Sequence, residues 1–519
     1  MDSYDEIPYE STPFPETHPA ALAPLARLFG IEAPDPEGCR VLEIGCASGG
    51  NLIPMALELP QSRFLGIELS ERQAADGAGL IQRLGLGNIQ IRQGDIAQFN
   101  EAGEGFDYII AHGIYSWVPA GVREGMLTLI RQQLSPNGIA YISYNTLPGW
   151  RWRGILRDML LFHVREARTA GERMERAWQL LDFVEQGMAN DQSLNARFLR
   201  QELKRIRGHH PSYLYHEYLE SENHPFLFTQ FVADAGRHGL SYVCESDLQA
   251  MFSQSLGDET GAWVEQQSGD MLTLWQYLDF AANRNLRQSL LCRDDRTPRY
   301  EIDLGRFTGY SFFANLRPPN KLDLRRGNKD VEFIRPGGER HSVEHPLTQA
   351  ALSLLGECYP DAIPLNALTE EARQRVAQAG NPRQAEEVDA MQSELFALYS
   401  HQAVGVRIKP RQWPEGNPAV PRLNALAREQ LALGMRQLTA AHLASIKLDP
   451  FGYRIALLCN GSNPLEAIIE AMTAIMPSEP ELAKLLSPGQ KNHPQRLRQS
   501  VEEGCREMIG LFAHHGLLE

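Results

Sequence analysis

The sequence predicts an α/β protein: a parallel sheet covered by helices over residues 1–296, followed by two small helix-rich modules. Two observations support this fold class. From residue 40 onward, short runs of β-type residues alternate with runs of helical periodicity, which is typical of parallel strands joined by helices. After residue 297 the sequence becomes polar and rich in proline and glycine, and a second proline-rich stretch, 409–422, separates two helical segments.

Seven strands are expected in the sheet. They are the runs 40–45, 63–68, 89–93, 106–111, 138–145, 240–244 and 286–293. The first, second and fourth runs are almost entirely apolar, as strands buried on both faces should be. Between the fifth and sixth strands, apolar residues recur at spacings of three and four, which predicts helices.

The predicted division of the chain has four parts. Residues 1–150 and 240–296 form a ligand-binding core, 151–239 a helical insertion, 297–412 one C-terminal module and 413–519 a second. A length of 519 residues agrees with several domains, because single hydrophobic cores stop growing at about 250 to 300 residues.

Composition and charge disfavour several classes of protein. With 43% hydrophobic and 22% charged residues, the chain resembles an ordinary globular protein, and no apolar run is long enough for a membrane span. The acidic start has no signal-peptide pattern, so we expect a cytoplasmic protein without membrane insertion. The net charge of -15 disfavours nucleic acid as a partner. Seven scattered cysteines without a C-x-x-C pair predict neither disulfides nor a zinc site.

A glycine-rich loop, EIGCASGGN (43–51), follows the first strand and ends at a predicted helix. Glycine allows a loop backbone to run against a ligand, and the free N–H groups of the helix face the same space. A dinucleotide-binding G-x-G-x-x-G pattern would use positions 45, 47 and 50. Residue 47 is alanine, however, and the middle glycine is the one that admits a pyrophosphate. The loop therefore favours a ligand without that group.

Acidic residues lie at or just after the ends of three consecutive strands: Glu43 and Glu68 at the ends of the first and second, and Asp95 after the third. An acid after the second strand is suited to the ribose hydroxyls of a nucleoside, and an acid after the third can accept from an adenine amine. Three carboxylates also favour a cation. A ligand that combines adenosine, no phosphate and a positive sulfonium is S-adenosylmethionine.

This arrangement resembles the class I S-adenosylmethionine-dependent methyltransferases, which have a Rossmann-like seven-stranded sheet with a reversed seventh strand. Longer motifs resemble the bacterial members with a methyltransferase regulatory region, a group that includes protein lysine methyltransferases acting on outer-membrane proteins. These motifs are YDEIPYESTPFPETHP (4–19), GGNLIPMA (49–56), AHGIYSWVP (111–119), SYNTLPGW (143–150) and YLYHEYLE (213–220). The resemblance covers most of residues 1–295 and, more loosely, the C-terminal modules.

The resemblance implies several features. Residues 151–239 would form a lid or dimerisation element, and the C-terminal modules would be winged-helix-like. The N-terminal arm, with Tyr4, Tyr9 and His18, would fold over the cofactor. The predicted cofactor-binding residues are Glu43, Gly45, Cys46, Ala47, Gly49, Asn51, Glu68, Leu69, Asp95, Ile96 and His112. The partner would be a protein, such as an outer-membrane protein before export, or a small molecule.

Methyl transfer from a sulfonium is a direct displacement, so the enzyme must align an uncharged acceptor. For lysine, the favoured acceptor, burial and a nearby positive charge would lower the amine pKa, and aromatic rings would tolerate the cationic product. The substrate-side candidates lie after the fourth and fifth strands. Those assigned a catalytic role are Tyr115, Trp117, Tyr144 and Asn145, and Ser116 and Trp150 lie beside them.

Three alternatives remain at this point. The acceptor could be a small molecule, because no sequence feature measures the width of its pocket. The protein could also bind S-adenosylmethionine without transferring the methyl group, as a regulator or scaffold. The adjacent His216 and Glu217 suggest a catalytic pair or half of a metal site, but a zincin motif would need a second histidine four residues later. We therefore predict an enzyme without a metal.

Overall fold

The computed structural model describes residues 3–99, 103, 105–325, 330–381, 387–491 and 493–519. The chain divides into two compact units. The first comprises residues 1–12 and 25–302, and the second comprises residues 13–24 and 303–519. The finer division into four parts stays a prediction.

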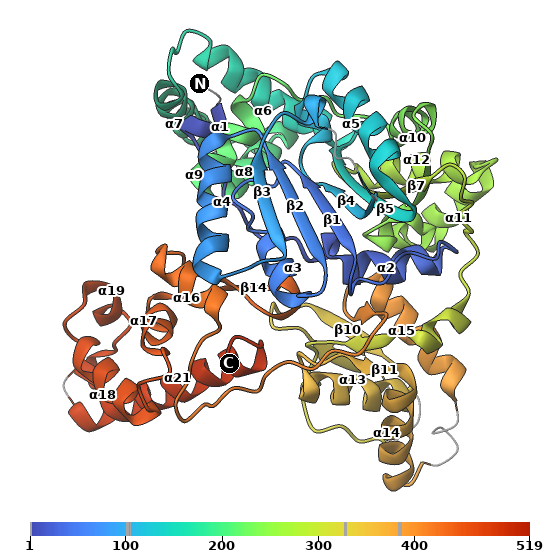
Figure 1. Ribbon diagram of the computed structural model, residues 1–519. Helices are drawn as coiled ribbons and strands as arrows, with labels where there is room; N and C mark the ends of the chain where they lie inside the picture. The colour runs from blue at the N-terminus through green and yellow to red at the C-terminus, as the bar shows by residue number, and fades with distance from the viewer. Residues whose placement is uncertain (1–2, 100–102, 104, 326–329, 382–386, 492) are drawn as a thin grey trace. The chain divides into compact units, whose positions relative to one another are not determined.

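A seven-stranded sheet forms the centre of the first unit (Figure 1). Its strands are β1 (Arg40–Ile44), β2 (Arg63–Glu68), β3 (Ile89–Gln93), β4 (Phe106–Ala111), β5 (Leu134–Asn145), β6 (Leu240–Glu245) and β7 (Leu286–Arg293). The spatial order is β3-β2-β1-β4-β5-β7-β6. Strands β1 to β5 pair in parallel, whereas β7 is antiparallel to both β5 and β6. The predicted fold class, including the reversed seventh strand, is confirmed.

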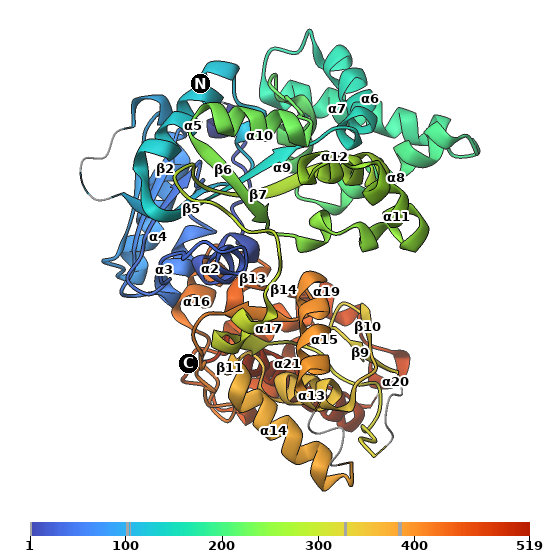
Figure 2. The same ribbon diagram turned by 90° about the vertical axis from the view of Figure 1, so that its right-hand side faces the viewer.

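The other helices of the first unit precede the sheet or lie between its strands. They are α1 (Ser3–Glu6), α3 (Leu52–Glu58), α4 (Glu71–Leu84), α5 (Ala120–Gln133), α10 (Phe228–Arg237), α11 (Asp258–Gln267) and α12 (Met271–Ala282); α2 (Pro19–Leu28) spans the division between the units. Short 3-10 helices lie at η2 (Ile96–Gln98), η3 (Tyr115–Trp117), η5 (Leu248–Met251) and η6 (Ser253–Leu256). Helices α10 and α12 lie against β6 and β7 (Figure 2).

The helical insertion follows β5. It contains α6 (Gly149–Val164), α7 (Ala170–Gly187), α8 (Leu194–Gly208), α9 (Pro211–Leu214) and the π-helix η4 (Tyr215–Leu219). Its buried side chains form a core of their own, in which Leu156 and Leu160 of α6 pack with Leu181 of α7 and Leu203 of α8. The apolar spacing in the sequence thus reflects packing within the insertion.

The second unit is rich in helices. Its first part contains η7 (Leu304–Gly309), β8 (Ser311–Phe313), β9 (Val331–Ile334), β10 (Arg340–Val343), α13 (Pro346–Cys358), β11 (Ile363–Pro364), α14 (Leu365–Gln378), α15 (Val388–Ser400) and β12 (Gly405–Arg407). Its second part contains α16 (Ala425–Ala432), β13 (Gln437–Thr439), η9 (Ala441–Leu443), β14 (Ser445–Lys447), α17 (Pro450–Leu458), α18 (Leu465–Ile475), α19 (Pro480–Ala483), α20 (Pro488–Lys491) and α21 (Pro494–His514). Strands β9 and β10 pair antiparallel and form a hairpin.

Candidate active site

The glycine-rich loop after β1 is held in an unusual backbone conformation. Gly45, Ala47 and Gly49 have φ angles of 67°, 49° and 78°, in the left-handed region. A Cβ atom on Gly45 would lie 2.3 Å from Ile114 Cδ1, so a larger residue would displace the Ile114 side chain and strain the backbone. Ala47 adopts this conformation although an L-residue is strained in it by about 1 to 2 kcal/mol. The loop therefore keeps a fixed shape at the edge of the sheet.

Glu43, on β1, has a carboxylate with one open oxygen. Its side chain is buried, and its Oε1 accepts a hydrogen bond from Asn51 Nδ2 at 2.8 Å. Its Oε2 has no hydrogen-bond partner among the described residues. Burial, with a smaller effect of the charge on Glu68, raises the pKa of Glu43 to about 8. Because an unpaired buried carboxylate oxygen is costly, this atom is suited to a ligand group that donates a hydrogen bond.

Glu68, the last residue of β2, connects the loop to α4. Its Oε2 accepts from the Ala47 N–H at 2.8 Å, and its Oε1 accepts from the Ser70 N–H at 2.9 Å. A carboxylate has about four lone-pair positions, so both oxygens can accept further hydrogen bonds from ligand hydroxyls. The next residue, Leu69, leaves 55% of its surface exposed, and it offers an apolar surface beside the carboxylate.

Asp95 and Ile96 follow β3, which pairs with β2. Asp95 is exposed, and its Oδ1 accepts from the Ala97 N–H at 2.9 Å, which starts η2. Ile96 is half-buried. Two carboxylates and two apolar side chains therefore follow two neighbouring strands, an arrangement suited to a nucleoside with a flat base.

Cys46 takes a different position. Its side chain is buried against β2, where a Cβ atom on Gly66 would lie 2.4 Å from its Sγ. Burial raises the pKa of the Cys46 thiol well above its ordinary value, so it stays neutral. Cys46 can therefore contribute its backbone to a ligand site but not a reactive thiolate.

His112 follows β4 and is neutral. Its Nδ1 lies 3.0 Å from the Tyr141 hydroxyl, and the two rings are nearly parallel. Burial lowers the pKa of His112 to about 4. At neutral pH the ring therefore has one donor and one acceptor nitrogen.

Tyr115 and Tyr144 lie in the core on the side of α10. Both rings pack against Phe231, with centroid distances of 5.2 Å and 3.9 Å. The Tyr115 hydroxyl donates to Asp234 Oδ2 at 3.3 Å, and the Tyr144 hydroxyl lies 3.3 Å from Ser289 Oγ. Both side chains are fully buried, so neither ring presents a free face to a substrate.

Trp117 and Asn145 lie at the ends of β4 and β5 and are brought together. Ser116 Oγ accepts from the Asn145 N–H at 2.9 Å, which joins the two strand ends. The Trp117 ring packs edge-on against Trp150 at 5.8 Å. The Trp150 indole is buried, and its Nε1 donates to no residue in the described part of the chain.

A segment that was not predicted from the sequence also reaches these strand ends. Asn145 Nδ2 donates to Asn223 Oδ1 at 3.1 Å, and the His224 N–H donates to the Ser116 carbonyl at 2.8 Å. Residues 223–226 carry no motif, and only the fold brings them here.

The N-terminal arm binds across the loop and α4. Asp5 Oδ1 accepts from Ser70 Oγ at 2.6 Å, the Tyr9 carbonyl accepts from Gln73 Nε2 at 3.2 Å, and Ser11 Oγ accepts from the Gly50 N–H at 2.7 Å. His18 belongs to the second unit. The Tyr4 side chain lies outside the described part of the structure.

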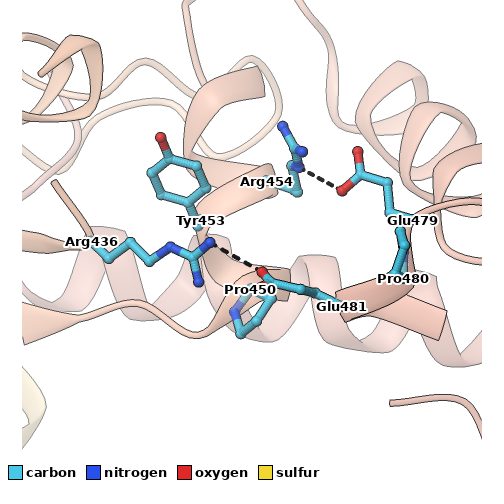
Figure 3. A pocket seen from close by; sticks show the side chains of 7 residues that line it. All are labelled: Arg436, Pro450, Tyr453, Arg454, Glu479, Pro480 and Glu481. Atoms are coloured by element: carbon cyan, nitrogen blue, oxygen red, sulfur yellow. Dashed lines mark hydrogen bonds and ion pairs between the residues drawn. The ribbon is translucent and has the colours of Figure 1, made fainter. Parts of the chain in front are cut away.

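The second unit contains a hollow of about 310 Å³ between α17 and α19 (Figure 3). Two arginines and two glutamates line it, but they are paired: Arg436 with Glu481 at 3.0 Å, and Arg454 with Glu479 at 2.8 Å. Because each charge is already compensated, this hollow is a weaker candidate for a ligand site than the sheet edge.

Comparisons with known proteins show which families and solved structures the chain resembles. A family model described as a methyltransferase domain matches residues 35–179, and one described as a predicted methyltransferase regulatory domain matches residues 210–293. An uncharacterised protein of Rickettsia prowazekii (strain Madrid E) is 31% identical over 529 residues, covering 99% of this chain and 93% of the relative. A second uncharacterised protein of that organism is 38% identical over 233 residues, covering 45% of this chain and 93% of the relative.

A solved structure is similar along nearly the whole chain. PKMT2 from Rickettsia typhi in complex with AdoHcy superimposes with a TM-score of 0.84 and 26% identity, covering 98% of this chain and 100% of PKMT2.

Proposed function

Because the chain belongs to the S-adenosylmethionine-dependent methyltransferases with a methyltransferase regulatory domain, we propose that it methylates lysine side chains of proteins. The observation that carries this proposal is the likeness to PKMT2, whose name denotes a protein lysine methyltransferase. This likeness spans both compact units and not the sheet alone. An outer-membrane protein before export is one acceptor that the family resemblance suggests.

The residues at the sheet edge fit S-adenosylmethionine, the cofactor of this enzyme. Glu43 Oε2, which is buried and open, would accept from the ammonium of the methionine part. Glu68 would hold the ribose hydroxyls and Asp95 the adenine amine, with Leu69 and Ile96 against the faces of the base. The backbone of Gly45 to Gly49 would follow the methionine part.

The bound cofactor supplies an electrophilic methyl group on a positively charged sulfur. We assign the acceptor side to Trp117, which lies in η3 after β4, and to Asn145, the last residue of β5. The Trp117 and Trp150 rings would exclude water and accommodate a cationic product. Tyr115 and Tyr144 would support the site from the core through their contacts with Phe231 and would not touch the acceptor.

Glu68→Ala tests the cofactor part of the proposal. It removes two hydrogen-bond acceptors, so the affinity for S-adenosylhomocysteine should fall at least about tenfold in calorimetry. Glu71→Ala, an exposed substitution in the first turn of α4, is the control. An unchanged affinity of the Glu68→Ala variant would exclude Glu68 from the site.

The acceptor is tested with cofactor labelled in its methyl group and a bacterial extract. Label recovered in methylated lysine after protein hydrolysis supports the proposal. Label in a metabolite would instead identify a small-molecule methyltransferase, and label in neither would indicate a regulator that only binds the cofactor.

The cysteines and helices also bear on where in the cell the enzyme acts. All seven cysteines are unpaired thiols, which agrees with a reducing compartment, and we propose that the enzyme acts in the cytoplasm. No helix in the described ranges is long and apolar enough to cross a membrane. We also propose that the helical insertion mediates association of two copies.

A further inference from the structure

A group of side chains that the proposed mechanism does not use lies where η4 meets the N-terminal arm. The π-helix η4 is a single wide turn, a backbone form frequently found at functional sites. His216 Nε2 lies 2.7 Å from the Ile7 carbonyl oxygen, and the Tyr9 ring packs edge-on against His216 at 5.4 Å. The same arm binds Gly50 and Gln73, so η4 is attached to the segment that crosses the cofactor loop.

Glu217 of η4 has an unpaired carboxylate. It is half-buried, and it accepts no hydrogen bond from any residue that the structure describes. Its charged neighbours are Arg153 and Arg157 of α6, His209 after α8, and His216. Burial outweighs their positive charge and raises the pKa of Glu217 to about 7.

The neighbouring cations have other partners, although Nη1 of Arg157 is buried without a hydrogen-bond partner among the described residues. Arg153 Nε lies 3.7 Å from Glu202 Oε2, and Arg157 Nη2 donates to the carbonyl oxygens of Glu220 and Ser221. Both ring nitrogens of His216 also have partners, since its Nδ1 lies 3.0 Å from Glu220 Oε1. Among these side chains, the Glu217 carboxylate can therefore still bind a further cation.

Aromatic side chains stand beside this carboxylate. The rings are Tyr9 of the arm and Tyr213 of α9, and the charge of Glu217 adds to burial in raising the pKa of both phenols. Neither hydroxyl donates a hydrogen bond to a described residue. Rings next to a carboxylate form the surroundings that an alkylammonium group prefers, through cation–π attraction and charge-assisted hydrogen bonds.

This group is continuous with the acceptor-side residues at the strand ends. The positive charge of Arg153 acts on Glu217, and the Arg153 guanidinium lies 5.3 Å from the centre of the Trp150 ring. Trp150 in turn packs against Trp117. Arg153, whose charge acts on Glu217, is therefore connected through Trp150 to Trp117 after β4.

We propose that Glu217, with Tyr9 and Tyr213, binds the ammonium group of the acceptor lysine and removes its proton before methyl transfer. This inference rests on the proposed function and deepens it by assigning the acceptor's base. The carboxylate takes one proton from the ammonium and becomes a neutral acid. The freed nitrogen lone pair forms the N–C bond while the S–C bond breaks, and the sulfur keeps that bond's electron pair.

The first test compares Glu217→Gln with the wild type and with Glu175→Gln, an exposed control on α7. Each protein is given labelled cofactor and the same bacterial extract, and label in methylated lysine is counted. Glu217→Gln should lower the initial rate at least about tenfold, as expected for loss of a base, while the control stays near the wild-type rate. A Glu217→Gln rate within twofold of wild type would overturn the inference. Label confined to a different acceptor in all three proteins would instead refute the proposed function and, with it, this inference.

The second test separates a base from a structural residue. The wild-type rate should rise as the pH passes through about 7, because the ionised carboxylate is the active form. Glu217→Gln should lose this rise, and Glu217→Asp should retain it. Calorimetric affinity for S-adenosylhomocysteine should stay within twofold in every variant. If Glu217→Gln fails to fold, the pH dependence of the rate of Glu217→Asp is used instead. A Glu217→Asp rate that does not rise through about pH 7 contradicts the inference. A lower rate with the wild-type profile in Glu217→Gln would also contradict it.

Discussion

Glu43 is the residue whose protonation should respond most clearly to ligand. Its pKa of about 8 means that the buried side chain is largely neutral near pH 7, whereas a ligand ammonium stabilises the ionised form. Binding of S-adenosylhomocysteine should therefore strengthen between pH 6 and 8, by up to about tenfold per pH unit. Calorimetry over this range checks the prediction, and Glu43→Gln should give a nearly constant affinity.

The same residue affects the stability of the free protein. Since its folded pKa lies above its ordinary value, its contribution to stability is present below about pH 4.5 and is lost as the pH rises through about 8. Glu43→Gln should remove this part of the pH dependence in urea denaturation. An unchanged dependence would show that the Glu43 carboxylate is hydrated.

Two substitutions after β4 should affect different properties of the protein, one its turnover and the other its stability. Trp117→Ala removes a ring on the proposed acceptor side, so turnover should fall while cofactor affinity stays unchanged. Tyr115→Phe removes a buried hydroxyl that donates to Asp234, so it should cost about 1 to 2 kcal/mol of stability and leave turnover near wild type. Steady-state rates and urea denaturation of both variants check this. A wild-type rate in Trp117→Ala would remove Trp117 from the acceptor side.

The candidate site was only partly predictable from single residues. Glu43, Glu68 and Asp95 could be identified because each lies at or just after the end of a recognisable strand. Tyr144 and Asn145 are consecutive, and consecutive strand residues point to opposite faces, but the sequence does not tell which face packs against α10. Asn223 reaches Asn145 through a tertiary contact that no local spacing encodes. Tyr9 was expected near the cofactor only because of the family resemblance.

At the level of the elements, β6 and β7 are fixed by a buried charged network. Arg287 of β7 pairs with Glu245 of β6 and with Asp279 of α12, each at 2.9 Å, and all three side chains are buried. The Arg287 guanidinium also lies 4.1 Å from the centre of the Phe228 ring of α10. One side chain thus joins the reversed strand to both helices that cover it.

Arg287→Met should leave two buried carboxylates without their shared cation and lower the free energy of unfolding by about 3 to 5 kcal/mol. Arg131→Met is a suitable control, because the Arg131–Asp294 pair is partly exposed and should contribute about 1 kcal/mol or less. Urea denaturation of both variants measures the difference. Equal losses in the two variants would contradict this view of the network.

The strands were the most predictable elements, since apolar runs of β1, β2 and β4 reflect burial on both faces. Strand β5 begins at Leu134, earlier than the predicted 138, because the polar segment after α5 extends the strand at an irregular register with β4. The π-helix η4 was not predictable, because a single wide turn leaves no periodicity in the sequence.

At the scale of the whole molecule, the insertion presents apolar side chains to solvent. Phe162 of α6, Phe183 of α7 and Leu194 of α8 are exposed by 69%, 72% and 69%. Phe162→Glu combined with Phe183→Glu should shift the protein from dimer to monomer in size-exclusion chromatography with light scattering. Leu433→Glu, exposed at 58% in the second unit, should not. A wild-type protein that is monomeric would exclude this role of the insertion.

Among its hydrogen bonds, the N-terminal arm accepts one each at Asp5, Tyr9 and Ser11 from residues of the cofactor loop and α4. At about 1 kcal/mol each, these bonds would make the fastened arm roughly a hundredfold more populated than the released one. S-adenosylhomocysteine would then leave while the arm is briefly released. Removal of the residues before Pro13 should therefore speed up release of this product and weaken its binding.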